Sequence, residues 1–151
     1  MSLEIKKLLP SNASELAEIM ALDPPGYAKY FVPFEFSESS FYKIISQAVK
    51  DHYFGLFYDN KLIGFYMLRG FDQGYSTPAY GVFITEKYSK KGLGRLTLKH
   101  AIATCKLDGA NKLMLKVHPE NISAKNLYQS EGFTINGEDA KYNNLIMIKE
   151  L

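Results

Sequence analysis

The chain of 151 residues contains a single cysteine, Cys105, so it cannot form a disulfide within itself. A lone thiol is in keeping with a reducing compartment. No apolar stretch is long enough to cross a bilayer. The first residues, Met1 to Glu4, have neither the charged region nor the apolar run of a signal peptide. These absences favour a soluble, cytoplasmic protein.

The chain also lacks a strong charge of either sign. Its 18 basic and 16 acidic residues leave a net charge of +2, which provides no general attraction to nucleic acids or anionic membranes. Internal repeats, low-complexity tracts and linker-like segments are absent as well. With 46% hydrophobic and 23% charged residues, residues 1–151 are expected to form one globular domain.

Hydrophobic periodicity predicts an α/β fold with a mixed sheet. An antiparallel meander precedes a strand–helix–strand crossover, which implies about seven strands with four helices on the two faces of the sheet. Segment 27–36 is rich in aromatic residues without a clear period and is expected to be irregular. The expected strands are 3–8, 52–58, 62–69, 79–84, 112–117, 133–136 and 145–151, and the expected helices are 11–22, 39–50, 92–107 and 121–131.

Segment 80–95, YGVFITEKYSKKGLGR, predicts a strand, a short loop and a helix that opens on two glycines. A helix start presents unpaired backbone N–H groups and the positive end of the helix dipole. Glycine lets a phosphate approach that backbone closely. Basic residues gather here in a nearly neutral chain, which indicates a local anion site: Lys87, Lys90, Lys91, Arg95 and Lys99.

The same loop has simpler explanations. An ordinary helix start with convenient glycines and solvated lysines would show this pattern, because G-x-G is short. The loop is not a P-loop, since no Gly-Lys-Ser/Thr follows at the required spacing. It is not the dinucleotide motif G-x-G-x-x-G either, because Thr97 occupies the position of the third glycine.

Segment 117–134, VHPENISAKNLYQSEGFT, predicts the end of a strand followed by a short helix. Asn121 and Tyr128 are nearly two turns apart, so they share one edge of that helix. Each residue has a purely structural explanation. Asn121 fits an N-cap, and Tyr128 fits an aromatic residue packed beside Leu127 and Phe133.

Taken together, Y-x-x-x-G-x-G and N-x-x-A-x-x-x-Y-x-x-x-G-F resemble the GCN5-related N-acetyltransferase (GNAT) superfamily. The motifs cover Tyr88 to Gly94 and Asn121 to Phe133, and the order of elements agrees over nearly the whole chain. The resemblance implies transfer of an acetyl group from acetyl-CoA directly to a primary amine of a small molecule, sugar or peptide, without a metal. It also implies a V-shaped cleft between the strand before the loop and its parallel neighbour.

The resemblance further implies how acetyl-CoA is bound. The backbone of the strand end would bond the pantetheine arm, and the loop would wrap the diphosphate. Asn121 would contact the pantetheine or adenosine region, and Lys125 would lie near the adenosine phosphate. Tyr128 would stand beside the thioester sulfur and protonate the leaving thiolate. The coenzyme-binding residues expected on this basis are Val82, Phe83, Ile84, Ser89, Lys90, Lys91, Gly92, Leu93, Gly94, Arg95, Asn121 and Lys125.

Two positions depart from family patterns. Ser89 replaces the usual arginine or glutamine, so phosphate binding would rest on its hydroxyl and on neighbouring lysines, with modestly lower coenzyme affinity. Some peptide-modifying members carry a glutamate base where this chain has Lys116. The oxyanion donor would be a backbone N–H near Phe83 or Ile84. The base stays open between a chain of water molecules and five side chains: Glu86, His118, Asp72, Glu35 and Tyr80.

The resemblance places acceptor specificity in residues 22–41 and 71–78. Aromatic side chains of the first region either surround an acceptor or pack the first two helices onto the sheet: Tyr27, Tyr30, Phe31, Phe34 and Phe36. The second region resembles loops of members associated with bacterial surface polysaccharides, whose acceptor is an amino sugar on a nucleotide carrier. Ribosomal-protein N-termini, polyamines, aminoglycosides and amino acids stay open.

Other functions predict different features. A coenzyme-binding module without catalysis would keep the glycine loop and lose the acid, whereas Tyr128 is present. A nucleic-acid-binding domain would use the lysines between 87 and 99, and the near-neutral net charge argues against it. The exposed edges of the meander and of the closing strand pair leave room for a homodimer, which is common in the family.

Overall fold

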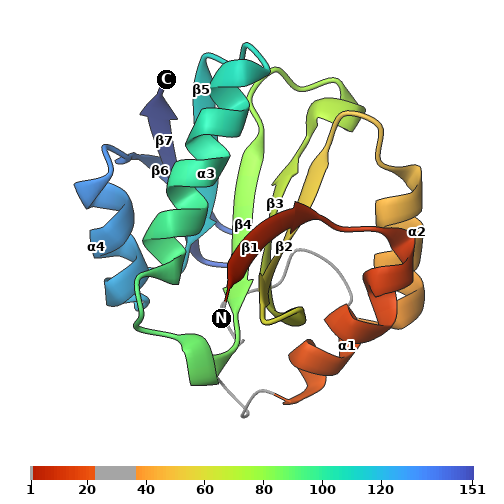
Figure 1. The fold of residues 1–151 in the computed structure, drawn as a ribbon. Coiled ribbons are helices and arrows are strands. Elements are labelled where there is room, and N and C mark those ends of the chain that lie inside the picture. The colour runs from red at the N-terminus through yellow and green to blue at the C-terminus, as the bar shows by residue number, and fades with distance from the viewer. Residues whose placement is uncertain (1, 23–36) are drawn as a thin grey trace.

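The computed structural model describes residues 2–22 and 37–151, which form a seven-stranded sheet in the order β1-β2-β3-β4-β5-β7-β6 (Figure 1). Neighbouring strands are antiparallel except for β4 and β5, which are parallel. The predicted mixed sheet is confirmed. The strands are β1 (Leu3–Lys7), β2 (His52–Tyr58), β3 (Lys61–Arg69), β4 (Ala79–Ile84), β5 (Lys112–Val117), β6 (Thr134–Asp139) and β7 (Asn144–Glu150).

Helices cover both faces of the sheet, with α1 and α2 on one side and α3 and α4 on the other (Figure 1). Two hydrophobic clusters hold these layers together. Phe41 of α2 packs with Phe65 of β3 in one cluster, and Leu98 of α3 packs with Tyr66 of β3 in the other. Successive residues of a strand point to opposite faces, which lets β3 serve both cores. The helices are α1 (Ala13–Leu22), α2 (Glu38–Gln47), α3 (Leu93–Leu107) and α4 (Ile122–Ser130).

A tight turn joins β2 and β3, two antiparallel strands of the predicted meander. Asp59 and Asn60 have φ values of 49° and 65°. Asparagine and aspartate tolerate this left-handed region, and two such residues in succession suit the twist of an antiparallel pair. The loop and the hydrophobic alternation of the flanking strands therefore agree.

The second helix differs from its predicted range of 39–50 at both ends. It begins at Glu38 because the hydroxyl of Ser37 accepts a hydrogen bond from the N–H of Ser40, which is an N-cap. It ends at Gln47 because the carboxylate of Asp72, distant in the sequence, accepts hydrogen bonds from the N–H groups of Val49, Lys50 and Asp51.

Smaller corrections concern other element ends. A 3₁₀ turn, η1 (Pro10–Asn12), precedes α1, and the side chain of Asn12 bonds the N–H of Leu9 at 2.8 Å rather than capping α1 from its end. The last two strands are shifted to Thr134–Asp139 and Asn144–Glu150, because a register shift between Ile135 and Gly137 breaks the alternation there.

Candidate active site

β4 and β5 part soon after they meet. Only Ala79 with Met114 and Tyr80 with Leu115 are paired across them, although β4 runs on to Ile84 and β5 to Val117. Over the same length β4 stays paired with β3. The predicted V-shaped opening therefore lies beside the end of β4, which is also where the predicted pantetheine-binding residues Val82, Phe83 and Ile84 lie.

The backbone of β4 alternates between its two neighbours. The N–H of Thr85 donates to Ile63 O on the β3 side at 3.0 Å, and Pro78 O accepts from Met114 N on the β5 side at 3.0 Å. Because such pairs alternate along an antiparallel ladder, the N–H and C=O of Val82 and Ile84 point to the β5 side. These groups face the opening left by the divergence of β5.

The loop after β4 leads into α3, whose N-terminus has no side-chain cap. Residues Lys90 and Gly92 both have positive φ values, 59° and 85°, and Gly92 is the N-cap of α3 without a side-chain cap. By contrast, side chains cap two of the other helices, Ser37 for α2 and Asn121 for α4. The first turn of α3 contains no acidic residue, and Lys91 is exposed beside it. This helix start is therefore arranged to accept an anion.

The two glycines of the loop differ in what they do for the fold. Gly92 has the left-handed backbone that favours glycine. Gly94 does not: a Cβ added there would meet only Leu127, at 3.4 Å, an ordinary van der Waals distance. The packing of the described residues therefore does not require glycine at position 94.

Two predicted phosphate ligands are engaged elsewhere. The Ser89 hydroxyl donates to Glu86 O at 2.7 Å, and the Ser89 N–H donates to the same oxygen at 3.1 Å. The guanidinium of Arg95 bonds the carboxylate of Glu131, just after α4, at 2.6 Å, and Lys99 reaches the same carboxylate at 3.3 Å. Within residues 2–22 and 37–151, Ser89 and Arg95 are thus the two predicted loop ligands whose side chains bond other groups of the protein.

The Arg95–Glu131 pair gives the protein a pH-dependent link between α3 and α4. Hydrogen bonding by Arg95, with the nearby Lys99, lowers the pKa of Glu131. A lowered folded pKa means stabilisation that is present above the ordinary glutamate value and lost as the pH falls through the lowered one. We expect Glu131→Gln to lower Tm by about 1–3 °C at pH 7 and to make no difference in acid.

Thermal unfolding between pH 3 and pH 8 measures this effect. Glu138→Gln, which removes an exposed carboxylate outside these ion pairs, is the control and should leave Tm unchanged. A deficit of Glu131→Gln that persists undiminished at pH 3 would contradict the electrostatic origin.

Helix α4 carries the second motif. The Asn121 side chain accepts a hydrogen bond from Ala124 N at 3.4 Å, so the N-cap interpretation of Asn121 holds. Lys125 is partly exposed one turn further on. Tyr128 is buried, with 8% of its surface exposed, and its ring meets the rings of Tyr80 at 6.4 Å and Phe133 at 5.9 Å.

The hydroxyl of Tyr128 is buried, and no hydrogen bond from the described residues offsets the loss of its contact with water. Within residues 2–22 and 37–151 no group forms a hydrogen bond with it, and burial alone raises its pKa to about 12. A buried hydroxyl normally has a partner. The side chain is protonated at physiological pH, so its O–H can donate a hydrogen bond.

The candidate bases do not form a single site. The Tyr80 hydroxyl lies 3.1 Å from Thr97 Oγ1, and burial raises its pKa well above the ordinary value, so it does not accept protons at neutral pH. The three backbone hydrogen bonds to Asp72 lower its pKa. Nδ1 of His118 accepts from Glu120 N at 3.2 Å. Glu86 is exposed, and Glu35 lies outside the described residues.

The acceptor regions are only partly described. Tyr27, Tyr30, Phe31, Phe34 and Phe36 lie outside the described residues. The loop 71–78 begins with a short 3₁₀ turn, η2 (Phe71–Gln73). Its Asp72 binds the N–H groups after α2, so this loop is tied to the α2–β2 connection rather than to the glycine loop.

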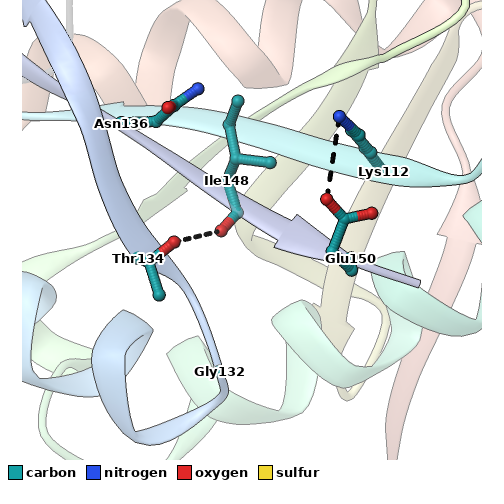
Figure 2. A pocket seen from close by; sticks show the side chains of 6 residues that line it. All are labelled: Lys112, Gly132, Thr134, Asn136, Ile148 and Glu150. Carbon is teal, nitrogen blue, oxygen red and sulfur yellow. Dashed lines mark hydrogen bonds and ion pairs between the residues drawn. The ribbon is translucent and has the colours of Figure 1, made fainter.

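A pocket of about 300 Å³ lies over β5, β7 and β6 and is lined by Lys112, Gly132, Thr134, Asn136, Ile148 and Glu150. Figure 2 shows the Lys112–Glu150 ion pair at one side and the Thr134 hydroxyl on the carbonyl of Ile148. Lys112 begins β5, whereas the opening lies beyond Leu115. The pocket therefore lies near the end of the sheet where β4 and β5 are paired, and none of the predicted site residues lines it.

Other classes of site are not found in the described part of the chain. It holds no group of three or more His, Cys, Asp or Glu residues suited to a metal ion. None of its helices has the length and apolar character needed to cross a membrane.

Sequence reasoning missed Thr97 as a functional candidate and noted it only as a missing glycine. Thr97 is a fully buried residue of α3 and forms a hydrogen bond with Tyr80. The available signal was a polar side chain in line with Ala101 and Cys105, the residues one and two turns further along the core-facing stripe of α3.

Comparisons with known proteins identify the family and the fold of the chain. Spermine/spermidine N(1)-acetyltransferase from Bacillus subtilis (strain 168) is 34% identical over 117 residues, 71% of this chain and 77% of that protein. 5-NmdU N-acetyltransferase of Pseudomonas phage PaMx11 is 25% identical over 150 residues, 97% of each chain. The structure of PaiA N-acetyltransferase from Thermoplasma acidophilum in complex with coenzyme A has a TM-score of 0.82 and 22% identity over 100% of both chains.

Residues 15–133 also match the sequence model of the Acetyltransferase (GNAT) family. The family match covers both the glycine loop and the helix that carries Tyr128. The predicted superfamily and fold are thereby confirmed. The chain belongs to the acetyltransferase (GNAT) family and is an N-acetyltransferase.

Proposed function

We propose that this N-acetyltransferase transfers the acetyl group of acetyl-CoA to a primary amine of a polyamine such as spermidine. The similarity to the Bacillus subtilis spermine/spermidine N(1)-acetyltransferase, at 34% identity over 71% of this chain, carries the choice of acceptor. We also propose that residues 1–151 act as one domain. The cytoplasmic location and the homodimer stay predictions.

The diphosphate of acetyl-CoA is proposed to bind at the start of α3, on the N–H groups between Lys90 and Arg95. The absence of a side-chain cap, the lack of acidic residues in the first turn and the exposed Lys90 and Lys91 support this placement. Because Arg95 is held by Glu131, its backbone N–H rather than its guanidinium is the proposed phosphate ligand. Ser89 is expected to contribute least.

The pantetheine arm is proposed to run along the end of β4. The N–H and C=O of Val82 and Ile84 point to the β5 side, where the two strands diverge. Hydrogen bonds to the backbone of Val82 would extend the sheet by a strand-like ligand, as in β-augmentation. Asn121 and Lys125, on α4, would then border the other side of the coenzyme.

Gly94→Ala tests the diphosphate placement. Alanine should stabilise the helix by about 0.5–1 kcal/mol relative to glycine, because the added Cβ meets only Leu127 at an ordinary distance. The same Cβ occupies the space proposed for a phosphate, so acetyl-CoA affinity should fall about tenfold through lost charge-assisted hydrogen bonds. Thermal unfolding and calorimetric titration measure the two effects.

The matched control is the reverse change at exposed Ala103 in the same helix. Ala103→Gly should lower stability and leave acetyl-CoA affinity unchanged. If Gly94→Ala bound acetyl-CoA like the wild type, the start of α3 would not be the phosphate site.

Tyr128 is proposed to act on the leaving sulfur. The neutral amine attacks the thioester carbonyl, and the carbon–sulfur bond then breaks as negative charge gathers on sulfur. The proton that the attacking nitrogen loses as the amide forms passes to water. The pKa of Tyr128, raised to about 12, lies above that of an ordinary thiol at about 8.5. Complete transfer of the proton from Tyr128 to the thiolate is therefore unfavourable. The buried hydroxyl is instead proposed to stabilise the thiolate by donating a hydrogen bond.

No described side chain is proposed as a dedicated base. Tyr80 and Asp72 are excluded by the direction of their pKa shifts. A polyamine nitrogen, with a pKa near the lysine value of about 10.4, would lose its proton to water before or during binding.

The similarity to the phage 5-NmdU N-acetyltransferase, which extends over 97% of both chains, supports 5-NmdU as a second candidate acceptor. A thiol-release assay with acetyl-CoA separates the candidates. The panel contains spermidine, spermine, 5-NmdU, a nucleotide-linked amino sugar and an aminoglycoside. Turnover with the two polyamines and not with the others supports the proposal, whereas turnover with 5-NmdU alone replaces it.

A further inference from the structure

Thr97 is the only buried polar residue of the described chain apart from tyrosines and Cys105. Its Oγ1 lies 2.9 Å from Leu93 O, 3.0 Å from Gly94 O and 3.1 Å from the Tyr80 hydroxyl. A threonine hydroxyl has one hydrogen to donate, and the two carbonyl oxygens are acceptors only. Thr97 therefore donates to the helix start and accepts from Tyr80.

The two ends of this hydrogen-bonded pair lie in different parts of the proposed coenzyme site. Leu93 and Gly94 form the first turn of α3, where the diphosphate is proposed to bind. Tyr80 forms the last pair between β4 and β5, with Leu115, so it marks the point where the strands part. The ring of Tyr80 also meets that of Tyr128 nearly edge-on, at 85°.

The hydroxyl of Thr97 is not explained by packing alone. It bonds Tyr80, a member of the hydrophobic cluster that includes Leu98 and Ala101, and valine would have the same shape as threonine. A buried hydroxyl costs free energy unless it is hydrogen-bonded. Here two buried hydroxyls bond each other and the carbonyls of one helix turn, which pins that turn to one residue of β4.

We propose that Tyr80 and Thr97 are positioning residues that fix the distance between the diphosphate-binding turn of α3 and the pantetheine-binding end of β4. The inference rests on the proposed function, because both halves of the site belong to the proposed coenzyme. The physical basis is preorganisation of the coenzyme site. A ligand that binds both halves of the site binds more tightly when their separation is fixed, whereas the affinity of a ligand that binds one half does not depend on that separation.

The experiment compares coenzyme A with its nucleotide half, adenosine 3′-phosphate 5′-diphosphate, which lacks the pantetheine arm. Both are titrated calorimetrically into wild type, Thr97→Val, Thr97→Ser, Tyr80→Phe and the double variant Tyr80→Phe/Thr97→Val. Valine keeps the shape of threonine without the hydroxyl, and serine keeps the hydroxyl. Each single variant leaves the remaining hydroxyl buried without its partner, which can destabilise the fold. The double variant removes both hydroxyls, so it tests the proposal even where a single variant folds poorly.

We expect coenzyme A to bind about tenfold more weakly to Thr97→Val, Tyr80→Phe and the double variant, with Thr97→Ser within about threefold of wild type. The nucleotide half should keep its affinity within about twofold in all of them. The double variant should lose no more than either single one, because the two residues act through one interaction. Equal weakening of both ligands, or an unchanged affinity for coenzyme A, would overturn the inference. If the wild type bound neither ligand, the proposed function itself would fail, which is a separate and recognisable result.

Discussion

Replacing Tyr128 with phenylalanine is expected to lower kcat about 100-fold while KM for acetyl-CoA stays within about threefold. The reason is that the hydroxyl donates a hydrogen bond to charge that develops on sulfur as the bond breaks, and one such donor contributes about 10²–10³-fold. In the ground state the sulfur is neutral, so binding gains little from the hydroxyl. Steady-state kinetics with spermidine and acetyl-CoA measure the separation of kcat from KM.

Stability gives this prediction an internal check. The Tyr128 hydroxyl has no hydrogen-bond partner among residues 2–22 and 37–151, and burial raises its pKa to about 12, so removing it should leave Tm equal or slightly higher. Tyr142→Phe, at an exposed tyrosine, is the control and should change neither rate nor Tm. A Tyr128→Phe variant with wild-type kcat would remove the hydroxyl from the chemistry.

The second large effect is expected at Gly64, which pairs with Ile84 at the end of β4. A Cβ on Gly64 would lie 2.6 Å from Phe83 O, a backbone atom that cannot rotate away. Gly64→Ala should therefore force β3 and β4 apart and cost about 1–3 kcal/mol, or several degrees in Tm. Because the displaced segment is the proposed pantetheine-binding edge, acetyl-CoA affinity should fall as well.

Gly94→Ala is the matched comparison, since it makes the same chemical change where the packing leaves room. Denaturant unfolding of the two variants should give shifts of opposite sign. A Gly64→Ala protein as stable as the wild type would contradict this prediction, because it would show that β3 and β4 can separate without cost.

Much of this fold could be predicted because its signals are local. The hairpin at Asp59 and Asn60, the strand 79–84 and the uncapped helix start after Gly92 each follow from residues within a few positions of one another. Asn121 and Tyr128 could be placed on one helix for the same reason. The function followed once these local signals were combined into a family motif.

What could not be predicted depends on side chains that meet across the fold. Asp72 ends α2 by binding backbone N–H groups 21–23 positions away. Glu131 takes the side chain of Arg95 from 36 positions away, which changes how Arg95 can serve the coenzyme. Hydrophobic periodicity indicates local structure and cannot reveal contacts between side chains far apart in the sequence. The raised pKa of Tyr128 likewise results from burial in the folded core.

The most direct test is a crystal structure of the protein with coenzyme A. The account predicts diphosphate oxygens within about 3.2 Å of backbone N–H groups between Lys90 and Arg95, a pantetheine arm along Val82 to Ile84, and the sulfur beside the Tyr128 hydroxyl. A diphosphate bound away from the start of α3, or a sulfur out of reach of Tyr128, would contradict it.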